Sequence, residues 1–144
     1  MNNIYPRVLV VSSVLETSKE MKDIVASLKG RGFRVTTCRY LSQVSEFLEK
    51  SKYESIFLDV LAFPNPDYEK NIRDGWTVAK LAEYFNKAVG SVQHGTKLFL
   101  LFRDHKADIS EATQISGYEA MFCLDGKNPS FITGFAESRI CGAY

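Results

Sequence analysis

The chain has 144 residues, of which 45% are hydrophobic and 24% are charged, and its formal net charge is +1 at pH 7. This composition is ordinary for a folded domain with a substantial core, and it excludes a disordered chain. The near-neutral charge excludes a strongly basic nucleic-acid-binding protein. We expect a single domain over residues 1–144, with its core at about 7–140.

The cysteines indicate a compartment. They are three in number, widely spaced and without a Cys-x-x-Cys pair, which favours reduced thiols over a disulfide framework or a zinc site. No secretory signal pattern opens the chain, and no apolar run approaches the length of a membrane-spanning helix. The sequence therefore predicts a cytoplasmic protein that does not contact a membrane.

Strand-like and helix-like segments alternate along the first half of the chain. A short apolar strand at 7–11 precedes Thr17-Ser18-Lys19-Glu20, which matches a capping box with Thr17 as the N-cap of a helix that ends near Gly30. The pattern then predicts a strand at 33–38, an amphipathic helix at 41–48 and a buried strand at 55–60.

The rhythm changes at 61–73, where Pro64 and Pro66 predict a long exposed loop. Asp74 follows as the expected N-cap of the next helix. The remaining expected elements are a central apolar strand at 97–102, a helix at 107–116, a strand at 119–124 and a helix at 130–140. Strict alternation of strands and helices predicts a parallel sheet with helices on both faces.

Chemistry in such a sheet gathers where the strands end. Asp59 ends the third strand, Ser12 and Ser13 follow the first, and Phe102 and Arg103 lie at the end of the fourth. We therefore place the candidate site of this chain at that edge.

Two motifs carry a family resemblance. The apolar strand Phe57-Leu58-Asp59-Val60, the proline-containing loop behind it and Asp74-Gly75-Trp76 resemble the receiver domains of bacterial response regulators, from about Arg7 to Ile140. The resemblance implies a doubly wound, flavodoxin-like three-layer sandwich with a five-stranded parallel sheet. It also implies phosphoryl transfer from a histidine kinase to Asp59, assisted by a divalent cation.

The sequence departs from that pattern at the residues that carry the chemistry. Ser12 and Ser13 occupy the positions of the acidic metal ligands, and Phe102 or Arg103 stands where receivers have a small hydroxyl residue. Lys127 is displaced from the place of the usual lysine. Magnesium favours carboxylate oxygens, which serines do not supply.

A buried aspartate without a metal ion needs another partner. Arg103, one strand away at the same edge, is the first candidate for an ion pair with Asp59, and Lys127 is the second. The sequence leaves open the alternative that Arg103 pairs with Asp104 or points to solvent.

These departures predict an atypical receiver-like module, without enzymatic activity, cofactor or metal, that binds another signalling protein or a second copy of itself. The expected surface combines the helix at 107–116, the fifth strand and the last helix. Its expected residues are Tyr118, Phe122, Ile132 and Arg139. We expect most of the neighbouring Met121, Phe131 and Phe135 in the core.

Two alternatives stay open. A working phosphoacceptor would use Asp59, with Glu16 and main-chain carbonyls holding magnesium. A small-molecule domain would instead bind a phosphate-containing ligand in the hydroxyl-rich loop from Ser12 to Ser18, before a helix N-terminus.

Overall fold

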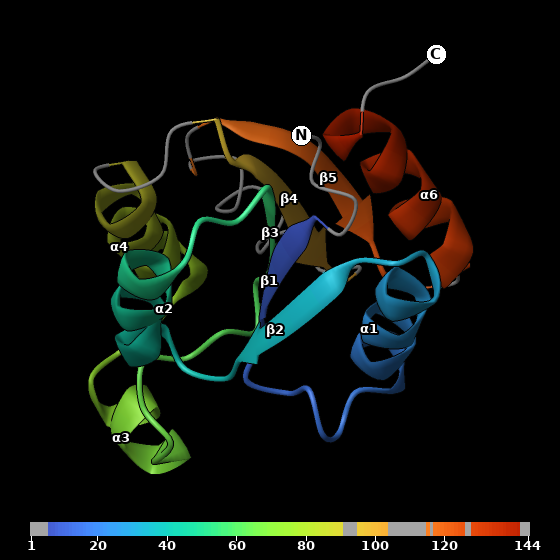
Figure 1. Ribbon diagram of the computed structural model, residues 1–144. Coiled ribbons are helices and arrows are strands. Elements are labelled where there is room, and N and C mark those ends of the chain that lie inside the picture. The colour runs from blue at the N-terminus through green and yellow to red at the C-terminus, as the bar shows by residue number, and fades with distance from the viewer. Residues whose placement is uncertain (1–5, 91–94, 104–114, 116, 126–127, 142–144) are drawn as a thin grey trace.

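A parallel sheet forms the centre of the protein. The computed structural model describes residues 6–90, 95–103, 115, 117–125 and 128–141. The sheet has five strands in the order β2-β1-β3-β4-β5, all parallel (Figure 1). This confirms the predicted doubly wound fold, and each strand lies within one residue of its expected bounds. The strands are β1 (Arg7–Val11), β2 (Arg34–Cys38), β3 (Ser55–Asp59), β4 (Lys97–Phe102) and β5 (Tyr118–Cys123).

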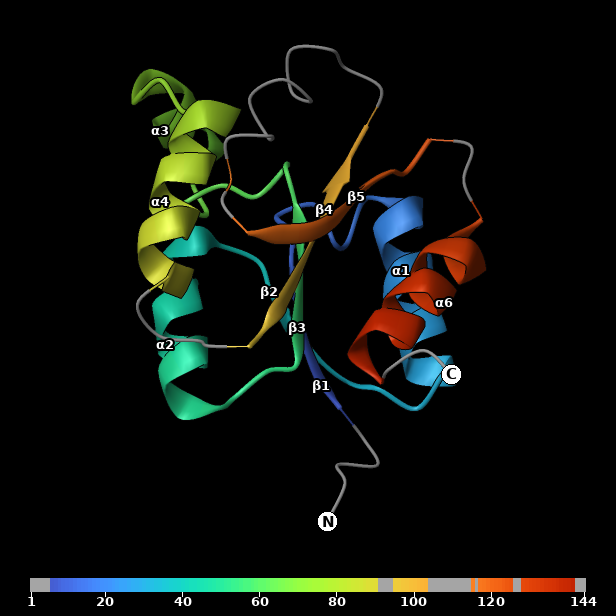
Figure 2. The ribbon, with the colours of Figure 1, turned by 90° about the horizontal axis from the view of Figure 1, so that it is seen from above.

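Helices form a layer on each side of the sheet (Figure 2). One face is covered by α1 (Lys19–Gly30) and α6 (Pro129–Ile140), and the other by α2 (Val44–Lys50) and α4 (Val78–Gly90). A 3-10 turn at Leu41–Gln43 leads into α2. The helix expected at 107–116 lies outside the described residues, apart from the buried Ile115. None of the described helices is long and apolar enough to cross a bilayer.

The central strand contributes to a separate apolar core on each face. Because side chains alternate along a strand, Ile56 and Leu58 pack toward α2 and α4, whereas Phe57 packs toward α1 and α6. Phe57 stacks on Phe99 of β4, with ring centroids 5.0 Å apart. All residues of β3 are buried, including Asp59 at its end, as is typical of a parallel strand with helices on both sides.

The first helix begins one residue later than predicted. Ser18, not Thr17, is the N-cap, because Ser18 has extended backbone angles and its Oγ accepts a hydrogen bond from the amide of Met21 at 3.2 Å. Thr17 belongs to the preceding turn, where its amide donates to the carbonyl of Val14. Glu20 is therefore one position short of the residue that completes a capping box.

The segment expected as a loop at 61–73 contains a short helix, α3 (Tyr68–Arg73), with Asp67 as its N-cap. Asp74 was predicted to open the next helix, and this prediction is wrong. Gly75 takes a φ of +71°, its amide donates to the carbonyl of Ile72, and the amide of Trp76 donates to the carbonyl of Asn71. This is a Schellman motif, which ends a helix.

The cysteines in the described residues are free thiols, with Cys38 buried, Cys123 half-buried and Cys141 exposed. Burial raises the pKa of the Cys38 thiol from its ordinary value of 9.0 to about 11. The folded chain therefore keeps this proton at a pH where the unfolded chain loses it.

A pH dependence of stability follows from Cys38. Its contribution is complete below about pH 9 and is lost as the pH rises toward about 11, so the free energy of unfolding should fall by ~2–3 kcal/mol over that window. Urea unfolding of Cys38→Ala should show a flatter profile than the wild type. Cys123→Ala controls for the loss of a thiol, and parallel profiles for Cys38→Ala and the wild type would contradict the prediction.

Candidate functional site

Asp59 lies at the carboxyl-terminal end of β3, and we call the side of the sheet formed by the carboxyl ends of its strands the carboxyl edge. At this edge, next to β1, the chain reverses the direction in which it winds around the sheet. β1 is flanked by β2 on one side and β3 on the other, so the crossovers that follow β1 and β2 lead to opposite sides of it. A crevice at such a switch point is the usual location of a site in this type of sheet. The side chain of Asp59 is fully buried there, and a buried carboxylate is stable only when it is hydrogen-bonded or paired.

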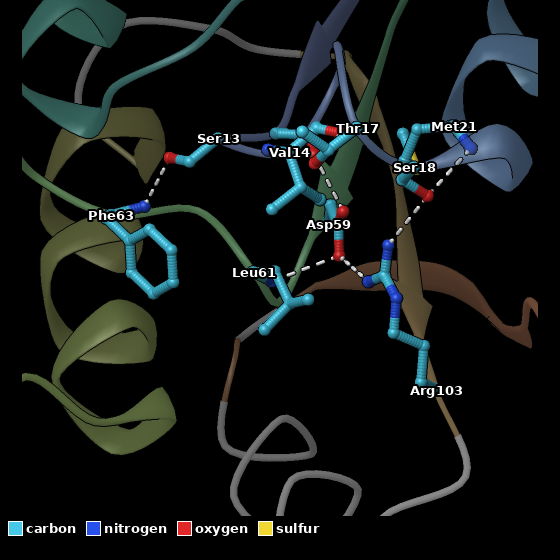
Figure 3. Close-up of polar contacts among 10 residues, drawn as sticks. Ser13, Val14, Thr17, Ser18, Met21, Asp59, Leu61, Phe63 and Arg103 are labelled. Atoms are coloured by element: carbon cyan, nitrogen blue, oxygen red, sulfur yellow. Dashed lines mark hydrogen bonds and ion pairs between the residues drawn. The ribbon is translucent and has the colours of Figure 1, made fainter. Parts of the chain in front are cut away.

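Three groups satisfy the Asp59 carboxylate (Figure 3). The hydroxyl of Ser12 donates to Oδ2 at 2.7 Å, and the amide of Leu61 donates to Oδ1 at 3.0 Å. Nη1 of Arg103 also donates to Oδ1, at 2.5 Å. The ion pair between Asp59 and Arg103, one of the two alternatives that the sequence left open, is therefore present. Asp104, the competing partner, lies outside the described residues.

Arg103 also connects the site to a helix. Its side chain is only 14% exposed, and Nη2 donates to Oγ of Ser18 at 3.3 Å. Ser18 is the N-cap of α1 (Figure 3), so one guanidinium joins the end of β3 to the start of a helix on the neighbouring face. The sequence placed Ser18 only in the alternative phosphate-binding loop and did not predict its contact with Arg103.

The adjacent serines have different partners. The Oγ of Ser12 binds the Asp59 carboxylate and accepts a bond from the amide of Val14. The Oγ of Ser13 accepts from the amide of Phe63 at 2.7 Å and donates to the carbonyl of Arg39 at 2.5 Å. Ser13 therefore fastens the loop after β3 to the end of β2, and it makes no hydrogen bond to Asp59.

Two other residues expected near Asp59 contact different parts of the protein. Glu16, considered as a metal ligand, forms an exposed ion pair with Arg39. Phe102 is half-buried and packs against the core between the sheet and α2 and α4. Lys127 lies outside the described residues.

The residues expected on an interaction surface divide between the core and the surface. Tyr118 and Phe122 are half-buried against the two cores. Arg139 is exposed, and its Nη1 lies 3.8 Å from Oε2 of Glu119 in β5. Its Cζ lies 5.1 Å from the centroid of the Phe135 ring. The prediction that Ile132 lies on the surface is wrong, because this side chain is 1% exposed in the core.

Phe131, expected in the core, is 62% exposed. The reason is the rotation of α6 about its axis. Ile132 and Ala136, four residues apart, face the sheet, and the side chain of Phe131 is about 100° away from Ile132 around the helix.

The oxygens at this edge do not suit magnesium. Magnesium demands near-octahedral coordination by hard oxygens, mainly carboxylates and water. Asp59 supplies a carboxylate, but both of its oxygens are engaged and one of them contacts a guanidinium. Within the described part of the chain, no group of three or more Asp, Glu, His and Cys side chains is arranged to hold a metal ion.

Solved receiver domains share the fold at low sequence identity. The receiver domain of a sensor histidine kinase from Pseudomonas aeruginosa, which has magnesium in its active-site cleft, aligns with a TM-score of 0.67 and 15% identity over 96% of this chain and 99% of that chain. A CheY-like receiver domain protein from Methanospirillum hungatei aligns with a TM-score of 0.65 and 14% identity over 95% and 94% of the two chains.

A longer protein shares the fold too. Response regulator DrrB of Thermotoga maritima, an OmpR/PhoB homologue, aligns with a TM-score of 0.59 and 15% identity over 93% of this chain. The alignment covers 52% of DrrB, so this chain spans about half the length of that protein. The sequence matches no protein-family model and no curated protein. The chain therefore has the fold of response regulator receiver domains.

Proposed function

We propose that this chain is a receiver-like signalling module that acts by binding another protein and that works without metal-dependent phosphorylation of Asp59. The contact between Arg103 and Asp59 is the observation that carries the proposal. The guanidinium supplies the positive charge that a carboxylate at this edge requires, and because it is part of the chain it is present at every metal concentration. The site then has a permanent counter-ion in place of an exchangeable one.

The environment of Asp59 also opposes phosphoryl transfer. Nucleophilic attack requires a free carboxylate oxygen in line with the donor phosphorus, with positive charge beside the transferring group. Asp59 is fully buried, and each oxygen already accepts at least one hydrogen bond. A donor would have to displace Arg103 from Asp59 and from Ser18, and the buried carboxylate would lose its counter-ion, which is costly.

The proposed partner is another signalling protein or a second copy of the chain. On α6, which belongs to the expected surface, Phe131 and Arg139 are exposed, together with Ser130 and Ser138. The free thiols of the described cysteines support a reducing compartment such as the cytoplasm. The alternative of a phosphate-binding loop at residues 12–18 has less support, because the hydroxyls of Ser12, Ser13 and Ser18 are all engaged within the protein.

The test is phosphorylation by acetyl phosphate in the presence of magnesium, followed by intact-mass spectrometry. We expect no stable phosphoryl adduct on the wild-type chain, while a receiver domain that is known to respond becomes modified in the same mixture. Addition of beryllofluoride and magnesium should leave the midpoint of thermal unfolding of the wild type unchanged. A magnesium-dependent adduct that is absent from Asp59→Asn would overturn the proposal.

A further inference from the structure

We infer that the outer edge of β2, together with a basic groove beside it, binds an acidic segment of a partner protein as an added β-strand. β2 is the first strand in the order of the sheet, and among the described strands only β1 pairs with it. An exposed strand edge is a template for another strand. The inference rests on β2 and α1 and does not depend on the state of Asp59.

The backbone groups on this edge can be assigned from the pairing with β1. The amide of Arg34 donates to the carbonyl of Pro6, and the carbonyl of Cys38 accepts from the amide of Ser12, so these groups point toward β1. Because the direction alternates along a parallel strand, the amides and carbonyls of Val35 and Thr37 point away from β1. These two residues present donors and acceptors with the spacing that an incoming strand requires.

A groove of about 360 Å³ lies between this strand and α1. An incoming strand would direct every second side chain toward this face of the sheet, so the groove would receive them. Its lining combines apolar and basic side chains and contains no acidic residue: Leu15, Lys22, Val25, Ala26, Lys29, Thr37 and Arg39.

The charge of the groove selects the partner. Lys22 and Lys29 are exposed and form no ion pair with any residue in the described ranges, whereas Arg39 pairs with Glu16. Arg34 adds a further exposed positive charge at the start of β2. Pairing two copies through this edge would bring these charges together, which is unfavourable. An extended segment with alternating acidic and apolar residues matches both the cations and the apolar floor of the groove.

The probe is a fluorescein-labelled octapeptide of alternating Glu and Val, measured by fluorescence polarisation. We expect saturable binding that weakens as salt is added, and no binding of the peptide in which Lys replaces Glu. An N-methylated form of the Glu/Val peptide should also fail to bind, because it cannot form the backbone hydrogen bonds of a strand. This last control separates strand pairing from attraction between charges alone.

Matched charge variants locate the binding. Lys22→Gln/Lys29→Gln should weaken binding of the Glu/Val peptide about tenfold, whereas Lys70→Gln/Arg73→Gln, which removes the same charge from α3, should change it less than about twofold. Amide exchange at Val35 and Thr37 should slow when the peptide is bound. The inference would be overturned by no binding, by equal binding of the Lys peptide or the N-methylated peptide, or by binding without protection of those amides. Self-association through β2 in the absence of peptide would overturn it as well. Phosphorylation of Asp59 would contradict the proposed function and leave these results unaffected.

Discussion

Replacing Arg103 with methionine should lower the free energy of unfolding by about 3–5 kcal/mol. Methionine retains much of the volume of the side chain, so the main loss is the positive charge beside Asp59. That carboxylate is fully buried and keeps only the bonds from Ser12 and Leu61 in the variant. A lone buried charge is costly because neither water nor a counter-ion compensates for its desolvation.

A double-mutant cycle measures the ion pair itself. Asp59→Asn alone should cost less than Arg103→Met, because Arg103 is partly exposed and can turn toward water. The combination Arg103→Met/Asp59→Asn should recover much of the loss, since it leaves no buried charge. Urea unfolding of the variants provides the measurement.

The matched control for this cycle is an exposed ion pair at the same edge of the sheet. Arg39 pairs with Glu16, and both side chains are more than half exposed, at 52% and 69%. Arg39→Met should therefore cost less than about 1 kcal/mol. If Arg103→Met costs no more than Arg39→Met, the contact with Asp59 is not what stabilises this edge.

Ser12→Asp combined with Arg103→Ala should convert the edge into a magnesium site. Ser12→Asp places a second carboxylate close to Asp59, because the Ser12 hydroxyl already lies 2.7 Å from Oδ2 of Asp59. Arg103→Ala removes the competing guanidinium. Adjacent buried carboxylates repel each other, so this variant should be less stable than the wild type without metal. Magnesium at about 100 times its dissociation constant should then add ~2.7 kcal/mol of stability.

Thermal unfolding at increasing magnesium concentration checks this prediction. The wild type should show no comparable stabilisation at the same ionic strength. Ser13→Asp/Arg103→Ala is the matched control, because the Ser13 side chain is directed toward Phe63 and Arg39. An equal response of the two variants, or a strong response of the wild type, would show that the position of the carboxylate does not control metal binding.

Local pattern was sufficient for much of the candidate site. Asp59 was predicted at a buried strand end because residues 55–60 are an apolar run, which is a local property of the sequence and is typical of a strand covered on both faces. The ion pair with Arg103 was considered because the ends of neighbouring parallel strands share one edge. Local pattern failed at Asp74-Gly75, where the same residues suit the start or the end of a helix, and the preceding helix α3 decided between the two.

By itself, the sequence determined the alternation of strands and helices and the edge at which Asp59 lies, because periodicity and burial are encoded in neighbouring residues. Only the tertiary structure decided which side chains form hydrogen bonds and ion pairs at that edge. The partners of Asp59 include Ser12, 47 residues away, and Arg103, 44 residues away, and the direction of each side chain depends on the packing between strands. Packing between strands also explains why Ser12 binds Asp59 whereas Ser13 binds the amide of Phe63. Packing against the sheet likewise sets the rotation of α6 that buries Ile132 and exposes Phe131.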